Sequence, residues 1–260
     1  MTVSFEASQS CDKFLRAGDN SPQACDTLQQ ARERLAQVHA RIANAVQHAC
    51  RPSNSVRLLA VSKLQLAAKI RALHEVGQRA FGENYVQEGV DKIAELSVLP
   101  EYADIEWHLI GPLQSNKTRV VAENFHWVHS VDRLKIAERL SAQRPAHLSP
   151  LNICIQVNIS GEASKSGCPP DEAHALIDAA SQLPQLSVRG LMGMPEPGIG
   201  EAATRQQFLM LAGLFAEARS RVASVDTLSI GMSEDLEIAV ACGSTMVRVG
   251  TALFGARPTP

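Results

Sequence analysis

The stretch that decides the fold is Arg57-Leu-Leu-Ala-Val-Ser-Lys63, a short apolar run that ends in a lysine. Seven more apolar runs follow along the chain, and the segments between them show helical periodicity, most clearly over residues 208–222. The runs are apolar nearly throughout, which is typical of parallel strands that are covered on both faces. The eight expected strands are Arg57–Ser62, Ala80–Glu83, Glu106–Gly111, Trp127–Val131, Asn152–Asn158, Val188–Met194, Thr227–Met232 and Met246–Val249.

Eight strands that alternate with helices in a chain of 260 residues predict one closed (β/α)8 barrel of the α/β class, the architecture called a TIM barrel. An open, doubly wound sheet is the alternative that the same alternation permits. No Gly-x-Gly-x-x-Gly loop follows the first run, so the sequence offers no support for that alternative. The chain also has no low-complexity linker that would separate a second domain.

An additional helix is expected before the first strand. Ser21-Pro22 offers an N-cap followed by proline at the first helical position. The spacing that follows permits a coiled coil, but it covers fewer than three heptads, so we expect a helix packed on the barrel. Residues 1–20 are polar and predict a poorly ordered leader, which leaves residues 21–257 as the barrel domain. The apolar face of the expected helix consists of Leu28, Ala31, Leu35, Val38, Ile42 and Ala45.

Composition and charge exclude several classes of function. The chain has 25 basic and 27 acidic residues and no run of Lys or Arg, so we expect neither nucleic-acid nor membrane binding. Its six cysteines are scattered without a Cys-x-x-Cys pair, which predicts neither a zinc site nor a disulfide framework. The N-terminus lacks the pattern of a secretory signal, and no segment approaches the roughly 20 apolar residues that cross a bilayer. A cytoplasmic protein without a bound metal is therefore expected.

Lys63 is the first candidate for chemistry, because it directly follows the first apolar run. In a barrel this position lies at the C-terminal end of the strand, on the face where active sites are built. Burial there favours the neutral amine, which Schiff-base chemistry requires. The alternative interpretation is that Lys63 only begins a solvated loop.

Two segments near the C-terminus are candidates for binding a phosphate group. Ser229-Ile-Gly-Met-Ser233 ends the seventh expected strand, and Met246-Val-Arg-Val-Gly-Thr251 ends the eighth. The loops after strands seven and eight commonly hold phosphate in such barrels. Gly250 allows a close approach of the backbone, and the Thr251 hydroxyl with neighbouring N–H groups can donate to oxyanions. Ser233 alone is also explained as a helix cap and Gly250 as a tight-turn residue, but both segments together, opposite the strand-one lysine, favour a phosphate site.

Further polar residues lie within strands or at their ends. Arg248 interrupts an apolar strand, and it either reaches the same mouth of the barrel or forms an ion pair in the core. Asn84, in Phe81-Gly-Glu-Asn-Tyr85, can touch a ligand ring or its oxygen. His108 faces either the barrel interior or the helix layer, and a hydrogen-bonded core histidine is the favoured interpretation. The loop Ser164-Lys165-Ser166-Gly167 resembles an anion-binding loop, or it is simply exposed.

Seven segments together closely resemble one family, the pyridoxal phosphate homeostasis proteins. The resemblance runs in collinear order from about residue 28 to residue 257. The fold of this family is similar to the barrel domain of alanine racemase, the N-terminal domain of that enzyme. The segments are AVSK at 60–63, FGENYVQEG at 81–89, WHLIGPLQSNK at 107–117, SKSG at 164–167, RGLMGMP at 189–195, SIGMSEDLEIAV at 229–240 and GSTMVRVGTALFGAR at 243–257.

The resemblance implies a binding site for pyridoxal 5′-phosphate (PLP). It implies that Lys63 forms a Schiff base with the cofactor, and that Arg248 faces the pyridine nitrogen. Since arginine only donates, that nitrogen would stay unprotonated and the ring would be a poor electron sink. Departures from the family pattern are small; Leu64-Gln65-Leu66 stands where a proline-containing loop is frequent. The residues expected to bind the cofactor are Lys63, Asn84, Met232, Arg248 and, around its phosphate, Ser233, Gly250 and Thr251.

The resemblance also implies a function without established catalysis. Alanine racemases carry a second β domain that supplies a tyrosine acid/base across the dimer, whereas this chain ends with the barrel and has only Tyr85 and Tyr102. Racemisation needs a proton donor and an acceptor on opposite faces of the substrate carbon. We therefore expect a monomeric PLP carrier or regulator in vitamin B6 homeostasis, with apo-enzymes as its partners. The alternatives are a PLP-dependent racemase or transaminase of amino acids, and a barrel enzyme acting on a sugar phosphate.

Overall fold

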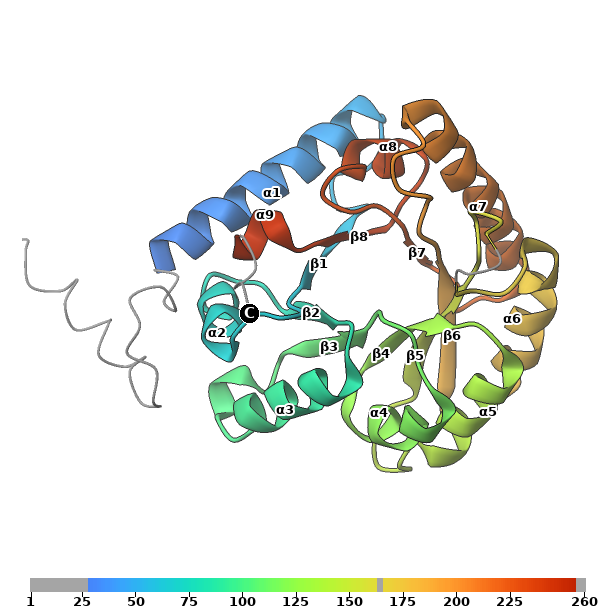
Figure 1. Ribbon diagram of the computed structural model, residues 1–260, viewed down its shortest axis with the longest axis horizontal. Helices are drawn as coiled ribbons and strands as arrows, with labels where there is room; N and C mark the ends of the chain where they lie inside the picture. The colour runs from blue at the N-terminus through green and yellow to red at the C-terminus, as the bar shows by residue number, and fades with distance from the viewer. Residues whose placement is uncertain (1–27, 163–165, 256–260) are drawn as a thin grey trace, which may run out of the picture.

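The computed structural model describes residues 28–162 and 166–255, and a closed barrel of eight parallel strands forms its centre (Figure 1). The strands are β1 (Arg57–Val61), β2 (Ala80–Glu83), β3 (Glu106–Leu109), β4 (Trp127–Val131), β5 (Leu151–Gln156), β6 (Leu186–Met192), β7 (Thr227–Ser229) and β8 (Met246–Val249). Each strand pairs with the next one in the sequence, and β8 pairs with β1, which closes the ring. The expected barrel is confirmed, and the open sheet is excluded.

Four strands end two to three residues earlier than the apolar pattern predicts. They are β3, which ends at Leu109, β5 at Gln156, β6 at Met192 and β7 at Ser229. Beyond β3 and β6, apolar residues such as Ile110 and Met194 line a cavity at the mouth of the barrel. Hydrophobicity therefore continues after strand pairing stops, and the pattern alone places these ends too late.

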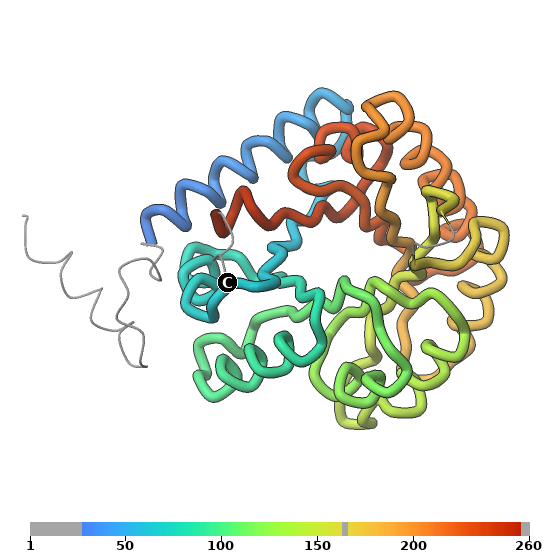
Figure 2. The backbone as a smooth tube through the Cα atoms, in the orientation of Figure 1, coloured from blue at the N-terminus to red at the C-terminus, as the bar shows by residue number. Residues whose placement is uncertain are grey.

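Helices alternate with the strands and surround the barrel, as the tube in Figure 2 also shows. No helix within the described ranges is long and apolar enough to span a membrane. Three short 3-10 helices lie in the connections: η2 (Pro100–Tyr102), η3 (Ser115–Lys117) and η4 (Pro170–Glu172). The α-helices are α1 (Leu28–His48), α2 (Ala67–Glu75), α3 (Val86–Ser97), α4 (Thr118–Asn124), α5 (Leu134–Gln143), α6 (Ala173–Ser181), α7 (Glu201–Arg221), α8 (Leu236–Ala241) and α9 (Thr251–Phe254).

The helix α1 precedes the alternation and packs on the barrel beside α2, α8 and α9 (Figure 1). Its apolar face is buried by the rest of the same chain, including Leu35, Val38 and Ile42. The expected additional helix is therefore confirmed, and the face with heptad spacing packs on the domain rather than in a coiled coil. The expected N-cap at Ser21-Pro22 and the expected leader at residues 1–20 lie outside the described residues.

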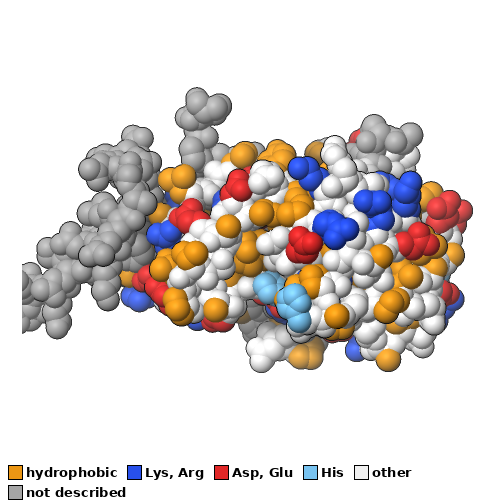
Figure 3. All heavy atoms as spheres, turned by 90° about the horizontal axis from the view of Figure 1, so that it is seen from below, with side chains coloured by type: hydrophobic (Ala, Val, Ile, Leu, Met, Phe, Trp, Pro, Cys, Tyr) orange, Lys and Arg blue, Asp and Glu red, His pale blue; other side chains and the backbone are white. Residues whose placement is uncertain are grey.

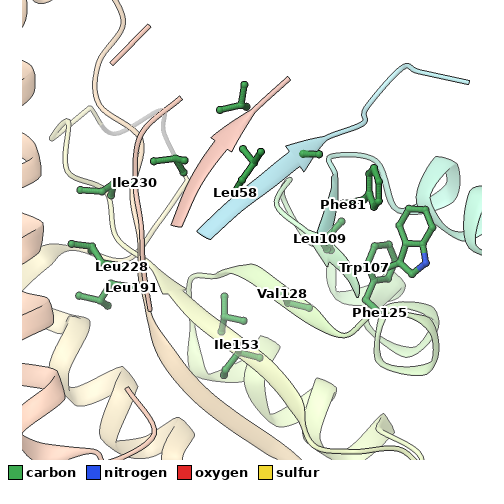
Figure 4. Close-up of a cluster of buried hydrophobic side chains, with 14 of the residues drawn as sticks. Leu58, Phe81, Trp107, Leu109, Phe125, Val128, Ile153, Leu191, Leu228 and Ile230 are labelled. Atoms are coloured by element: carbon green, nitrogen blue, oxygen red, sulfur yellow. The ribbon is translucent and has the colours of Figure 1, made fainter. Parts of the chain in front are cut away.

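Side chains of the strands alternate between the outside and the inside of the barrel. The outward ones pack against the helices in one large cluster, in which Leu58, Phe81 and Leu109 lie around the ring of strands (Figure 4). The inward ones include two small apolar groups, Leu59 with Ala80 and Met246, and Trp127 with Cys154 and Met192. Side chains therefore fill the interior of the barrel, as is usual for this fold.

The surface carries charges of both signs close together. On the face shown in Figure 3, Lys and Arg side chains lie among Asp and Glu side chains, and no extended area of one sign is present there. Among the described residues, ion pairs such as Arg71–Glu95 and Arg57–Glu106 also bring opposite charges together. An even mixture of charges on this face offers nothing to attract a polyanion there.

Candidate functional site

A cavity of about 680 Å³ opens at the C-terminal ends of the strands. Its wall is built by the loops that follow β1, β2, β3, β6, β7 and β8, together with side chains of β1 and β8. The residues expected to bind a cofactor come from distant parts of the sequence, and the structure brings all of them to this one wall. They are Lys63, Asn84, Met232, Ser233, Arg248, Gly250 and Thr251.

Lys63 lies in the tight turn that follows β1, half-buried in the wall of the cavity. A hydrogen bond from the Gln65 N–H to the Ser62 carbonyl oxygen, at 3.1 Å, closes the turn. Leu64 lies in the left-handed region with φ 58°, a conformation that costs a side-chain-bearing residue about 1–2 kcal/mol. Its N–H donates to Glu88 Oε1 at 2.6 Å, which holds this strained residue in place. The backbone is therefore fixed on both sides of the lysine.

A buried network of acids and a lysine supports the same turn. Lys92 Nζ, on α3, donates to the Ser62 carbonyl oxygen at 2.7 Å, to Glu83 Oε1 at 2.9 Å and to Glu88 Oε1 at 2.6 Å. The Ser62 hydroxyl donates to Glu83 Oε1 at 2.6 Å. Glu83 is fully buried, and burial raises the pKa of its carboxyl even though Lys92 opposes the rise. The network thus joins β1, β2 and α3 next to Lys63.

The loop after β7 begins at a glycine that the backbone requires. Gly231 has φ +95°, and a Cβ there would lie 2.5 Å from a side-chain carbon of α8. The Met232 N–H donates to Asp235 Oδ1 at 2.5 Å, and Arg41 of α1 donates to the Ser233 carbonyl oxygen at 3.0 Å. The additional helix α1 therefore helps to hold the loop that carries Met232 and Ser233.

The loop after β8 packs closely on β1. A Cβ on Gly250 would lie 3.3 Å from the carbonyl oxygen of Val61, the last residue of β1. Close packing of the two strand ends therefore already favours glycine at this position. Thr251 follows as the first residue of α9. As a result, Gly250 and Thr251 lie beside the strand whose next turn carries Lys63.

Arg248 is buried inside the barrel and reaches the cavity wall. It donates to the Ser229 carbonyl oxygen at 2.5 Å, to Ser229 Oγ at 2.9 Å and to the Gly193 carbonyl oxygen at 3.1 Å. Burial lowers the pKa of Arg248 to about 10, so the guanidinium remains charged at neutral pH. No carboxylate of the described residues forms an ion pair with it, so the alternative of a core ion pair is wrong. Arginine has more N–H groups than these three bonds use, which leaves donors for a ligand.

Sequence analysis missed two parts of the wall. One is the segment after β6, where residues 194–204 supply Met194, Glu196, Glu201 and Thr204; the pattern placed Met194 at the end of an expected strand and gave none of the four a role in a site. The other is Ile110–Pro112, after β3. The signal that could have found both is the one that indicated Lys63, a position directly after a barrel strand.

One other polar candidate, His108, does not line the cavity. His108 lies inside the barrel with both ring nitrogens hydrogen-bonded, which confirms a satisfied core histidine. Lys165 lies outside the described residues. Within residues 28–162 and 166–255, no cluster of three or more side chains that could hold a metal ion is present.

Comparisons with known proteins identify the family. The family description "Alanine racemase, N-terminal domain" matches residues 34–258. A protein of Pseudomonas aeruginosa named "Pyridoxal phosphate homeostasis protein" is 57% identical over 225 residues, which cover 86% of this chain and 95% of the relative. The chain belongs to the pyridoxal phosphate homeostasis protein family. The expected family is thereby confirmed.

Solved structures of this family and of distant relatives share the barrel. A structure of PipY from Synechococcus elongatus PCC7942 with PLP bound is 40% identical, has a TM-score of 0.74, and covers 86% of this chain and 100% of that chain. Alanine racemase from Corynebacterium glutamicum is 15% identical with a TM-score of 0.65, and covers 89% of this chain but 62% of that chain. The racemase likeness shows the fold alone, so the homeostasis family, not the racemases, is the close relation.

Proposed function

We propose that this chain binds PLP through a Schiff base on Lys63 and acts, without catalysing a reaction, in cytoplasmic PLP homeostasis. The observation that carries the proposal is that Lys63 lies in one cavity wall with the loops that follow β7 and β8. The names of the close relatives and the PLP-bound structure of PipY support it. When bound, PLP supplies an aldehyde that condenses with a lysine amine.

The residues in the wall fit the chemical groups of PLP. The amine of Lys63 suits the aldehyde, and the hydroxyls and backbone N–H groups of Ser233, Gly250 and Thr251 suit the phosphate, because loops in these positions commonly bind one. Arg248 has donors left for the pyridine nitrogen. Asn84 and Met232 would complete the site from the loops after β2 and β7.

Several observations favour a carrier over a racemase or transaminase. Neither tyrosine of the chain lines the cavity: Tyr85 is 55% exposed and Tyr102 packs edge-on against His74. The described site therefore offers no tyrosine on the face opposite Lys63 for a second proton transfer. Incubation of the PLP-loaded protein with L-alanine discriminates between these functions. Steady formation of D-alanine or pyruvate would assign the enzyme and reject the carrier.

The partners proposed for the carrier are PLP and the apo-enzymes that receive it. A monomer is proposed because the apolar face of α1 is already buried within the chain and is not available to a second copy. Sedimentation of the purified protein tests the monomer. Loss of PLP from this chain to an added apo-enzyme, faster than its loss to buffer, tests direct transfer.

The attachment of PLP at Lys63 is tested with the purified protein. We expect the PLP-loaded protein to be yellow, to change its absorbance on reduction with borohydride, and to yield one modified peptide that contains Lys63. Reduction fixes a Schiff base as a secondary amine, so peptide mapping reads the site directly. A colourless protein whose cavity binds only a sugar phosphate would instead support the barrel enzyme without a cofactor.

Replacing Arg248 by alanine is expected to alter the absorption spectrum of bound PLP more than its stoichiometry. The reason is that Arg248 would contact the ring nitrogen, whereas Lys63 and the phosphate loops would retain the cofactor. Titration with PLP, followed by absorbance and by dialysis, measures both quantities. Because Arg248 is buried, thermal unfolding of the variant is recorded alongside. A folded variant that binds little PLP would contradict the role assigned to this residue.

A further inference from the structure

A chain of hydrogen bonds runs through the barrel interior from the cavity wall to the opposite end of the strands. Arg248 Nη1 lies 2.9 Å from Ser229 Oγ, and Ser229 Oγ lies 3.0 Å from His129 Nδ1. His129 Nε2 lies 2.9 Å from His108 Nδ1, and His108 Nε2 lies 2.8 Å from Glu106 Oε1. The five residues come from β8, β7, β4 and β3, so this series of hydrogen bonds crosses the barrel interior.

With both imidazoles neutral, the two ends of this hydrogen-bond chain set the direction of each donor between them. Arg248 can only donate, so Ser229 Oγ accepts there and its own hydrogen is available for His129 Nδ1. An ionised carboxylate can only accept, so His108 must donate from Nε2 to Glu106. The remaining bond then runs from His129 Nε2–H to His108 Nδ1. Both neutral imidazoles then carry their hydrogen on Nε2. Each of the four hydrogen bonds in this series has one donor and one acceptor.

Burial and charge support this assignment of protons. Burial lowers the pKa of His108, and it lowers the pKa of His129 well below the usual value, with the charge of Arg248 adding to the effect. Burial would raise the pKa of Glu106, but its interactions with His108 and Arg57 together outweigh this and place the pKa well below its usual value. The histidines are therefore neutral and the carboxylate is ionised at neutral pH.

Packing holds the rings in place. His108 stacks on Trp127, with ring centroids 5.2 Å apart and planes 11° from parallel. Both histidines are fully buried, and a buried group that loses its hydrogen-bond partner is destabilised by the full cost of its desolvation. A reversal of one ring would leave two such groups unpaired. Packing and hydrogen bonding therefore both oppose reorientation of the rings, and Arg248 is bonded to Ser229 at the end nearest the cavity.

We propose that Ser229, His129, His108 and Glu106 form a positioning relay, which holds the guanidinium of Arg248 in one orientation at the cavity wall. The relay keeps the Ser229 hydroxyl turned toward His129, so that its lone pairs face Arg248. Its consequence for PLP rests on the proposed function, but the orientation of Arg248 does not.

The first test reads the protons in the ligand-free protein. Nitrogen-15 NMR of labelled histidine is expected to show His108 and His129 as neutral rings with hydrogen on Nε2 at pH 7. A ring with hydrogen on Nδ1, or a doubly protonated ring, would overturn the relay. The measurement uses the wild-type chain, so it does not depend on the folding of any variant.

The second test changes the relay at a residue that does not touch Arg248. His129→Asn and His129→Leu have nearly the same shape, but only asparagine offers Ser229 an acceptor oxygen. We expect solvent exchange of the Arg248 side-chain N–H groups to be about fivefold faster in the leucine variant than in the asparagine variant, as for the loss of one hydrogen bond. Equal exchange in the two variants would overturn the positioning role.

The same pair of variants separates the relay from the cofactor proposal. With PLP bound, His129→Leu is expected to shift the absorption maximum, while His129→Asn keeps the wild-type spectrum. A wild-type protein that binds no PLP would reject the proposed function, whereas the exchange rates in the ligand-free variants would still decide whether the relay positions Arg248.

Discussion

Replacement of Lys63 by alanine is expected to abolish covalent attachment of PLP and to leave weak binding through the phosphate. The amine is the group that forms the Schiff base, so no adduct should remain after borohydride reduction. The loop that carries Ser233 is held by contacts of its own, including the hydrogen bond from Arg41 to the Ser233 carbonyl oxygen. Mass spectrometry of the reduced protein measures the adduct, and equilibrium dialysis measures the residual binding.

The matched control for this experiment is Lys135→Ala, which removes an exposed lysine of α5 outside the cavity wall. This variant is expected to retain the full adduct. If Lys63→Ala still gives a reduced adduct at wild-type stoichiometry, the cofactor is attached to a different lysine, and Lys165 is the first to be mapped. Complete loss of binding in a folded Lys63→Ala protein would instead show that the phosphate loops contribute little.

The sequence predicts the barrel well because its strands carry their own signal. Each run is short, apolar and followed by a helical period, so number and order follow from the pattern. The ends of β3, β5, β6 and β7 do not follow from the pattern, since strand pairing depends on the neighbouring strands. Apolar residues such as Ile110 continue beyond the paired residues into the cavity wall.

Part of the candidate site could likewise be predicted from the sequence, and part of it could not. Lys63, Ser233 and Thr251 could be found because each comes just after an expected strand, and strand ends meet at the mouth of a barrel. The residues that hold these loops in place could not be predicted, since they lie far away in the sequence. Nothing in the sequence pairs Lys92 with the carbonyl oxygen of Ser62, thirty residues earlier, or Arg41 with the loop after β7.

Replacement of Lys92 by methionine is expected to destabilise the protein by about 3–5 kcal/mol at pH 7, because it leaves the carboxylate of Glu83 buried without a counter-charge. Burial already raises the pKa of Glu83, and loss of Lys92 raises it further. A raised folded-state pKa means that protonation favours the folded state, so the deficit should shrink as the pH falls below that pKa and be largest above it. Urea unfolding of wild type and variant across this pH range measures the difference.

The double variant Lys92→Met with Glu83→Gln is the control that separates charge from packing. Glutamine removes the uncompensated charge and still accepts a hydrogen bond from Ser62, so most of the lost stability should return and its pH dependence should disappear. Some loss should remain, because Lys92 also holds the Ser62 carbonyl oxygen and Glu88 beside the turn of Lys63. A single variant that loses less than about 1 kcal/mol, the range of an exposed ion pair, would show that the Glu83 carboxyl is already neutral in the folded protein. The turn that carries Lys63 would then be held by hydrogen bonds alone. A stabilising role for the buried ion pair between Lys92 and Glu83 would be rejected.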